Sequence, residues 1–229
     1  MVRPTLKKQI PNLQEAIKDA AWKQIAREGA PALSLRAIAR KLKITAPAIY
    51  NYFSDRDALV TALIIDAYTS FGDSQLAARD EVPPDDVVGR MTAIGLAYRQ
   101  WAHTYPQRYQ LIFGTPIPGY KAPLMEVLPS AARSLSILVS VVEQLRLAGR
   151  LNIKSFPKVQ EEFKAGFEMW KKYGGEADII SLSIAMLIWA RVHGIVSLEI
   201  AGNLPPFGTS GDDLYLYEMN SITQQFIRG

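Results

Sequence analysis

Apolar residues recur every three to four positions along nearly the whole chain, and this period constrains the fold more than any other feature. It is the period of an α-helix, in which residues three and four apart share one face. No segment alternates between apolar and polar residues, as a half-buried strand does, and no segment repeats another. The sequence therefore predicts an all-α protein.

Composition narrows the class of protein further. The chain has 229 residues, 48% of them hydrophobic, which is enough for a well-buried core. It contains no cysteine, which excludes disulfides, thiolate metal sites and a cysteine nucleophile and is typical of a cytoplasmic protein. The longest near-apolar run, residues 179–190, is shorter than the roughly 20 residues of a membrane span. We expect a core helix there, with no membrane, metal or cofactor.

The positive charge is concentrated near the N-terminus. Residues 1–60 contain eleven Lys or Arg and five Asp or Glu, whereas the remainder contains fifteen and seventeen. Such a local excess is expected of a module that neutralises the phosphates of DNA, although solvated basic faces are also common. The charge distribution therefore indicates where a nucleic acid would bind.

Three short helices are expected before residue 57, each preceded by a residue that can cap it. Their caps are Asn12, Ser34 and Thr45, and the helices run to about Glu28, Leu42 and Phe53. The segment from Ser54 to Asp57 has the spacing of a capping box, which predicts a longer helix to about residue 75. We expect a DNA-binding domain at 1–57, a linking helix at 58–82 and a second domain at 83–229.

The second and third helices, at residues 34–53, have the layout of a helix-turn-helix. In this motif one helix crosses the phosphate backbone and places the next in the major groove of double-stranded DNA. Apolar residues would fix the angle between the two helices and leave small residues facing outward. The candidate DNA contacts are Ser34, Arg36, Thr45, Ala46, Pro47, Ala48, Tyr50, Asn51, Tyr52 and Arg56.

Several of these candidates have an alternative interpretation. Arg36 is the one long fork-shaped donor near the groove and suits guanine, but it can equally be a solvated surface arginine. Tyr50 and Tyr52 carry hydroxyls suited to phosphate oxygens, or their rings pack in the core of the small domain. Asn51 can pair with an adenine edge or bond a phosphate.

The same residues resemble the helix-turn-helix of the tetracycline-repressor (TetR) family. The resemblance is carried by Leu33-Ser34-x-Arg36-x-Ile38-Ala39, followed by Ile44-Thr45-x-x-x-Ile49-Tyr50-x-Tyr52-Phe53-x-x-Arg56-Asp57-x-Leu59. It implies operator binding by a homodimer. By that resemblance Ser34, Tyr50, Tyr52 and Arg56 match phosphate-contacting positions, and Arg36, Ala46, Pro47, Ala48 and Asn51 match positions that face the bases. Lys43 departs from the pattern, because a turn glycine is usual there.

The remainder of the chain predicts a helical domain that begins after Pro83-Pro84. Helices are expected at about 86–104, 106–113, 124–148, 157–173, 176–202 and 212–227, with breaks at 114–119, 174–175 and 205–208. The segments around Tyr98-Arg99-Gln100-Trp101 and Trp189-Ala190-Arg191-Val192-His193-Gly194 resemble a C-terminal regulatory domain named for its Trp-His-Gly signature. That resemblance implies a small-molecule sensor.

Aromatic residues of this domain could line a mostly apolar ligand pocket, as ligand cavities usually are. The candidates are Tyr98, Trp101, Tyr109, Phe113, Phe167, Trp170, Trp189 and His193. Aromatic stripes at helical spacing are also ordinary core, and a histidine on an apolar helix is often a satisfied core residue. The pocket residues are therefore expectations for the structure to place.

The last two helices are apolar on more than one face and could form an intersubunit four-helix bundle. Outward positions on the closing helix would be Leu214, Tyr217, Ile222 and Phe226. The alternative is that both helices are core helices of a monomer. A symmetric dimer would match two half-sites about 34–36 Å apart.

The sequence thus predicts a sequence-specific transcriptional regulator, a repressor released from its operator by a small apolar or aromatic effector. A helical enzyme is one alternative, but the chain lacks a glycine-rich phosphate loop, a metal-spaced cluster and a recognisable nucleophile motif. A DNA-binding protein without sequence preference or effector is another.

Overall fold

The computed structural model describes residues 11–205 and 211–228, which form ten α-helices and no strand. The predicted all-α class is confirmed. In chain order the helices are α1 (Leu13–Glu28), α2 (Leu35–Leu42), α3 (Ala46–Tyr50), α4 (Arg56–Asp80), α5 (Val87–Thr104), α6 (Pro106–Phe113), α7 (Leu124–Leu147), α8 (Glu161–Gly174), α9 (Ile179–Ile200) and α10 (Gly211–Phe226). Most of the break predicted at 205–208 lies outside the described residues.

Side-chain caps begin the first two helices, as the sequence predicts. The Oδ1 atom of Asn12 accepts a hydrogen bond from the amide of Glu15, and the Oγ atom of Ser34 accepts one from the amide of Ala37. Each bond satisfies an amide that a helix leaves without an internal partner. These caps fix the residues at which α1 and α2 begin.

The third and fourth helices begin and end differently from the prediction. Thr45 occupies the cap position of α3, but its side chain makes no capping hydrogen bond, and the helix ends at Tyr50 rather than Phe53. The predicted capping box at Ser54 was wrong. Asp55 caps α4 by accepting an amide hydrogen bond at 2.8 Å, and the hydroxyl of Ser54 bonds to the Asp55 carboxylate instead.

The turn between α2 and α3 passes through the left-handed region at Lys43, where φ is 55° and ψ is 37°. The amide of Lys43 donates to the carbonyl of Arg40, and the amide of Ile44 donates to that of Ala39. This pattern closes many helices and is usually completed by glycine. A β-carbon in this conformation costs roughly 1–2 kcal/mol. The tight turn therefore forms despite the lysine.

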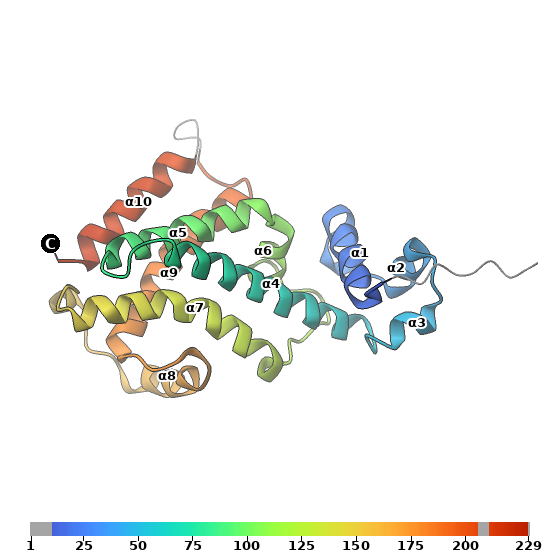
Figure 1. Ribbon diagram of the computed structural model, residues 1–229, viewed down its shortest axis with the longest axis horizontal. Helices are drawn as coiled ribbons and strands as arrows, with labels where there is room; N and C mark the ends of the chain where they lie inside the picture. Colours follow the sequence, from blue (N-terminus) through green and yellow to red (C-terminus); the bar gives the residue numbers. More distant parts are fainter. Residues whose placement is uncertain (1–10, 206–210, 229) are drawn as a thin grey trace, which may run out of the picture.

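The helix α4 belongs to both parts of the molecule, as Figure 1 shows. Near its start Leu59 and Leu63 are buried in one apolar core with α1, α2 and α3, and we call this unit the head. Farther along, Ala67 and Phe71 are buried in a second core, formed with α5 to α10, which we call the lobe. The helix continues to Asp80, beyond the predicted end near residue 75.

The lobe is built around α4, α5, α7 and α9. The helices α5 and α7 pack against α4, and α9 packs against both of them, while α8 and α10 lie on opposite sides of the lobe in Figure 1. By length and hydropathy alone α7 and α9 could each cross a membrane. Here they carry much of the lobe core, which agrees with the core helix predicted at residues 179–190.

The last two helices present apolar side chains both inward and outward. Ile222 and Phe226 are buried in the lobe core, so the prediction that they face a partner subunit was wrong. Their inward direction follows from helical geometry, because they share a face with buried Tyr215 and Met219. Among the described residues, the large apolar side chains that are exposed on the two helices are Leu187, Leu198, Leu214, Leu216 and Tyr217.

Candidate nucleic-acid interface and ligand cavity

The head presents the second and third helices on its surface. Ile38 of α2 and Ile49 of α3 are buried, and together they hold the two helices at a fixed angle. The predicted DNA contacts lie on the other side. Of these, Arg36, Thr45, Pro47 and Asn51 are exposed, and Ser34, Ala46 and Ala48 are half-buried. At the start of α3 the side chains on this surface, those of Ala46, Pro47 and Ala48, are small and uncharged, which allows a duplex to approach closely.

Two tyrosines flank the end of α3. The side chains of Tyr50 and Tyr52 are 47% and 46% exposed, so the alternative that their rings pack in the core is wrong. Tyr50 is the last residue of α3, and Tyr52 lies in the turn that follows. Both hydroxyls can therefore reach a phosphate without any change in the packing of the head.

The two arginines of the predicted interface differ in their surroundings. Arg36 is exposed in the first turn of α2. Arg56, in the first turn of α4, is half-buried, and its Nε atom donates to the Oδ1 atom of Asp57 at 2.9 Å. A phosphate contact by Arg56 would have to share its guanidinium with that carboxylate.

A cavity of about 270 Å³ lies within the lobe, between α4, α5, α7, α9, α10 and the end of α6. Three of the predicted ligand contacts line it, namely Tyr98, Phe113 and Trp189. The complete lining is Tyr68, Phe71, Gln75, Met91, Ile94, Gly95, Tyr98, Phe113, Ala131, Ser134, Leu135, Leu138, Met186, Ile188, Trp189, Val192, Met219 and Ile222. The aliphatic and methionine residues were not predicted, because at helical spacing they cannot be told from core.

The other predicted aromatic contacts lie outside this lining. Trp101 is buried, and its Nε1 atom donates to the Oγ atom of Ser70 at 3.0 Å. Phe167 and Trp170 stack on each other along α8, with ring centroids 6.2 Å apart. Tyr109 faces a different hollow, described below. These residues hold the lobe together around the cavity rather than facing into it.

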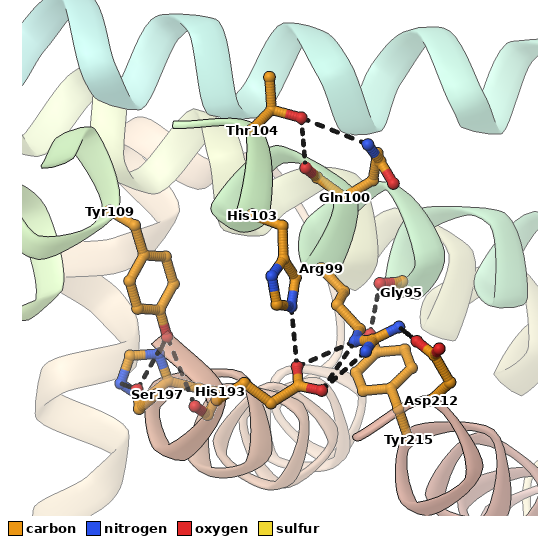
Figure 2. A network of polar contacts seen from close by, with 11 residues as sticks. Gly95, Arg99, Gln100, His103, Thr104, Tyr109, His193, Ser197, Asp212 and Tyr215 are labelled. Atoms are coloured by element: carbon orange, nitrogen blue, oxygen red, sulfur yellow. Dashed lines mark hydrogen bonds and ion pairs between the residues drawn. The ribbon is translucent and has the colours of Figure 1, made fainter. Parts of the chain in front are cut away.

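His193 is a hydrogen-bonding centre behind the cavity wall. Its Nδ1 atom lies 2.8 Å from the hydroxyl of Tyr98 and 3.1 Å from that of Tyr109, and its Nε2 atom lies 3.3 Å from Ser197 Oγ. The Ser197 hydroxyl is in turn 2.8 Å from that of Tyr109 (Figure 2). Burial lowers the pKa of His193 below its ordinary 6.5. The neutral form of the ring is therefore favoured at pH 7, in which one nitrogen donates and the other accepts, and the hydroxyl partners can serve either.

The cavity has a neutral interior. No charged side chain lines it among the described residues. Two of its polar side chains bond to the backbone, since Gln75 Nε2 donates to the carbonyl of Phe71 at 3.3 Å and Ser134 Oγ to that of Ala131 at 2.7 Å. Burial also raises the pKa of Tyr98, so this phenol stays protonated. Burying a charged ligand group here without a partner would be costly.

A second polar cluster, which the sequence did not predict, joins α5 to α9 and α10. The carboxylate of Glu199 is almost fully buried and accepts hydrogen bonds from the Arg99 guanidinium at 2.7–3.1 Å and from His103 at 3.1 Å. Arg99 also pairs with Asp212 at 2.6 Å and lies over the ring of Tyr215. Burial alone would raise the pKa of Glu199, but these hydrogen bonds outweigh it and lower that pKa.

The comparisons with known proteins agree for both parts of the chain. Residues 17–63 match the model of bacterial regulatory proteins of the tetR family, and residues 91–222 match that of the tetracyclin repressor-like C-terminal domain. HTH-type transcriptional regulator Rv1816 of Mycobacterium tuberculosis H37Rv is 33% identical over 190 residues, which is 83% of this chain and 81% of the relative. The regulator Mb1846 of Mycobacterium bovis is equally similar.

Solved structures show the same likeness. The crystal structure of the regulatory protein SCO4313 has a TM-score of 0.73 and 35% identity, over 94% of this chain and 100% of that one. A protein of unknown function from Rhodococcus sp. RHA1 shares the fold, with a TM-score of 0.74 and 21% identity, over 99% of this chain and 100% of that one.

Proposed function

The chain belongs to the tetracycline-repressor family of transcriptional regulators, and from this we propose that it is a repressor released from its operator by a small, neutral, mostly apolar molecule. The observation that carries the proposal is the cavity in the lobe, whose wall includes Tyr68, Phe71 and Gln75 of α4. The same helix begins in the head. A molecule bound in the lobe therefore touches the element that positions the DNA-binding surface.

Operator recognition is assigned to the exposed face of α2 and α3. In this proposal Arg36 reads a base edge, the small residues at the start of α3 contact thymine methyl groups, and Asn51 bonds a base or phosphate. Tyr50, Tyr52, Ser34, Thr45 and Arg56 bind the phosphates and set the register. The basic excess of residues 1–60 supports the placement of DNA against the head.

A homodimer is the assembly that this function requires. On the outer sides of α9 and α10, Leu187, Leu198, Leu214 and Tyr217 are each more than two-fifths exposed. Arg191 of α9 reaches Ser221 and Glu218 of α10, so the two helices present one rigid surface. We propose that two copies of this surface form a four-helix bundle, which places the two α3 helices on successive major grooves.

Release follows from a change in α4. A ligand that fits best when the cavity is widened favours the lobe geometry in which α4 is displaced, and Leu59 and Leu63 carry that displacement into the head. The two α3 helices then no longer match the spacing of the grooves. The size of the effect is limited by the difference in the ligand's affinity for the two geometries.

We propose that the protein acts as a regulator and not as an enzyme. The described residues contain no group of three or more His, Asp or Glu placed to hold a metal ion. His193 is held between Tyr98, Tyr109 and Ser197, and its nitrogens are engaged within the protein. We propose that the protein acts in the cytoplasm, where its DNA target lies.

The test has two parts. Selection from a random pool of duplex DNA should yield a palindromic operator, and binding to it should exceed binding to scrambled duplex by at least about 1000-fold at physiological salt. Native mass spectrometry should then show a neutral small molecule that co-purifies, and adding it should weaken operator binding.

The cavity variant Ala131→Phe should lose the ligand response and keep operator binding, whereas Ala148→Phe, at the exposed end of α7, should keep both. Sequence-blind binding would contradict the repressor assignment. A ligand response that survives in Ala131→Phe would contradict the assignment of the cavity.

A further inference from the structure

A second hollow lies where the head meets the lobe. It has a volume of about 780 Å³ and is bounded by the end of α1, by α6 and the loop after it, and by the end of α9. Head residues Ile25 and Pro31 form one side of it, and Ser197 and Ile200 of α9 form another. We call this hollow the junction cleft. An occupant would touch the head and the lobe at once.

The junction cleft and the lobe cavity are neighbours. Among the described residues, Phe113 is the one side chain that lines both. Its ring packs within 5.0 Å of His193 and 5.7 Å of Phe71, measured between centroids. Phe113 is also the last residue of α6, and Gly114 after it begins a loop. One aromatic side chain at a helix end therefore separates the two spaces.

The two spaces differ in chemistry. The cavity is apolar, and its polar side chains Gln75 and Ser134 are already bonded to backbone carbonyls. The junction cleft carries Gln107, Gln110 and Thr115, together with the paired hydroxyls of Tyr109 and Ser197. No charged side chain lines the cleft among the residues that the structure describes. Its hydrogen-bonding groups are amides and hydroxyls only.

We propose that the effector is an amphipathic molecule with an uncharged head group, whose apolar part fills the lobe cavity and whose hydrogen-bonding part passes Phe113 into the junction cleft. This inference rests on the proposed function and specifies its ligand. A carboxylate or ammonium group would find no opposite charge in the cleft, whereas an amide or alcohol would find donors and acceptors. The bound head group would lie against Ile25 and Pro31 of the head.

A rival exit from the cavity lies at Met186. This side chain lines both the cavity and a shallow groove beside α8 that includes Phe163 and Leu187. The groove is mostly apolar, but Lys158, Gln160 and Ser183 also line it, so an exit there would favour a carboxylate over the other head groups. It also contains Leu187, which belongs to the surface proposed for the dimer, whereas the junction cleft faces away toward the head.

The experiment compares probes that share one tail. Octanamide, 1-octanol, octanoate and octylamine are titrated into the dimer by calorimetry, with p-xylene as a probe of the cavity alone. We expect the amide and alcohol to bind about tenfold more tightly than the two ions, which is the effect of roughly one good hydrogen bond. The double variant Gln110→Leu/Thr115→Val removes hydrogen-bonding groups from the cleft, so it should weaken the binding of octanamide and 1-octanol and leave p-xylene binding unchanged.

Enlarging either side of the cavity provides the control. Phe113→Ala joins the cavity to the cleft and should tighten octanamide binding, whereas Met186→Ala, which opens toward the groove, should not alter the preference among head groups. Octanamide and 1-octanol binding that is unchanged in the double variant, or p-xylene binding with no preference among the four octyl probes, overturns this inference and leaves the proposed function standing. Failure of every probe, p-xylene included, overturns the cavity assignment and this inference with it.

Discussion

The hydroxyl of Tyr98 lies 2.8 Å from the Nδ1 atom of His193, and this hydrogen bond joins α5 to α9 at the edge of the lobe cavity. The Tyr98 ring lines the cavity, while His193 lies behind it and also reaches Tyr109 and Ser197. The shape of the cavity wall thus depends on a neutral imidazole. Protonation would make both ring nitrogens donors and leave neither able to accept a hydrogen bond from these hydroxyls.

A pH dependence follows from this contact. Because burial lowers the pKa of His193 below 6.5, the unfolded chain binds the proton more readily than the folded one. The free energy of unfolding should therefore fall as the pH drops below 6.5 and be unaffected by this residue above it. Chemical denaturation of wild type and His193→Gln between pH 5 and 8 measures the difference. An equal slope in both proteins below pH 6.5 would contradict the assignment.

Arg36 and Arg56 should affect DNA binding in different ways. Arg36→Ala should cost about 1–3 kcal/mol at the selected operator and relax the preference at one base pair, because a fork-shaped donor to guanine is lost. Arg36→Lys keeps the charge but not the fork and should also relax that preference. Arg56→Ala should weaken all sequences alike and reduce the salt slope by about one. Fluorescence anisotropy over a salt series distinguishes the two, and an unchanged preference in both Arg36 variants would show that it does not read a base.

Replacing Lys43 should stabilise the head. Glycine adopts the left-handed conformation of this turn without the steric cost of a β-carbon, and Lys43→Gly should raise the free energy of unfolding by about 1 kcal/mol. Lys43→Ala removes the same charge but keeps the β-carbon, so it should give no comparable gain. Urea denaturation measures both. Equal stability of the two variants would show that charge, not backbone conformation, decides the effect.

The buried carboxylate of Glu199 should matter more to stability than an exposed one. Glu199→Gln leaves the Arg99 guanidinium without its main buried partner and should cost about 1–3 kcal/mol. Asp73→Asn removes an exposed partner of Arg133 and should cost less than about 1 kcal/mol. Both keep the shape of the side chain, so thermal and urea denaturation compare charge pairs directly. A similar loss in the two variants would contradict this difference.

The proposed dimer surface is tested by a single charge. Leu198→Glu places a carboxylate on the outward side of α9 and should convert the dimer to monomer, with loss of operator affinity. Met125→Glu introduces the same charge at an exposed apolar side chain of α7 and should leave the dimer intact. Analytical ultracentrifugation measures the oligomeric state of both variants. A dimer that persists in Leu198→Glu would show that another surface joins the subunits.

Local patterns in the sequence predicted the helices and several of their ends. Asn12 and Ser34 cap α1 and α2 as expected, because a cap needs only a side chain and an amide three residues away. The predicted start of α4 was wrong by one residue. Two neighbouring polar residues, Ser54 and Asp55, can each cap the helix, and the sequence does not show which of them does so.

The direction in which each apolar side chain points was less predictable. Helical spacing places Tyr98, Trp101 and Tyr109 on inward faces, and all three are indeed buried. Only the packing of several helices decides that Tyr98 meets the cavity, that Trp101 packs on Phe71 and that Tyr109 faces the junction cleft. These environments are separated by a few ångströms, which a periodic pattern does not resolve.

The sequence by itself determined the helical class and the helix-turn-helix, because these depend on contacts between residues close together in the chain. Only the tertiary structure shows the lobe cavity, the hydrogen-bonded cluster around Glu199 and the position of Phe113 between the cavity and the junction cleft. Each of these joins residues far apart in sequence, as when Arg99 meets Glu199 or Phe113 meets His193. Such contacts exist only after the helices have packed, since their distances are set by the relative positions of whole helices.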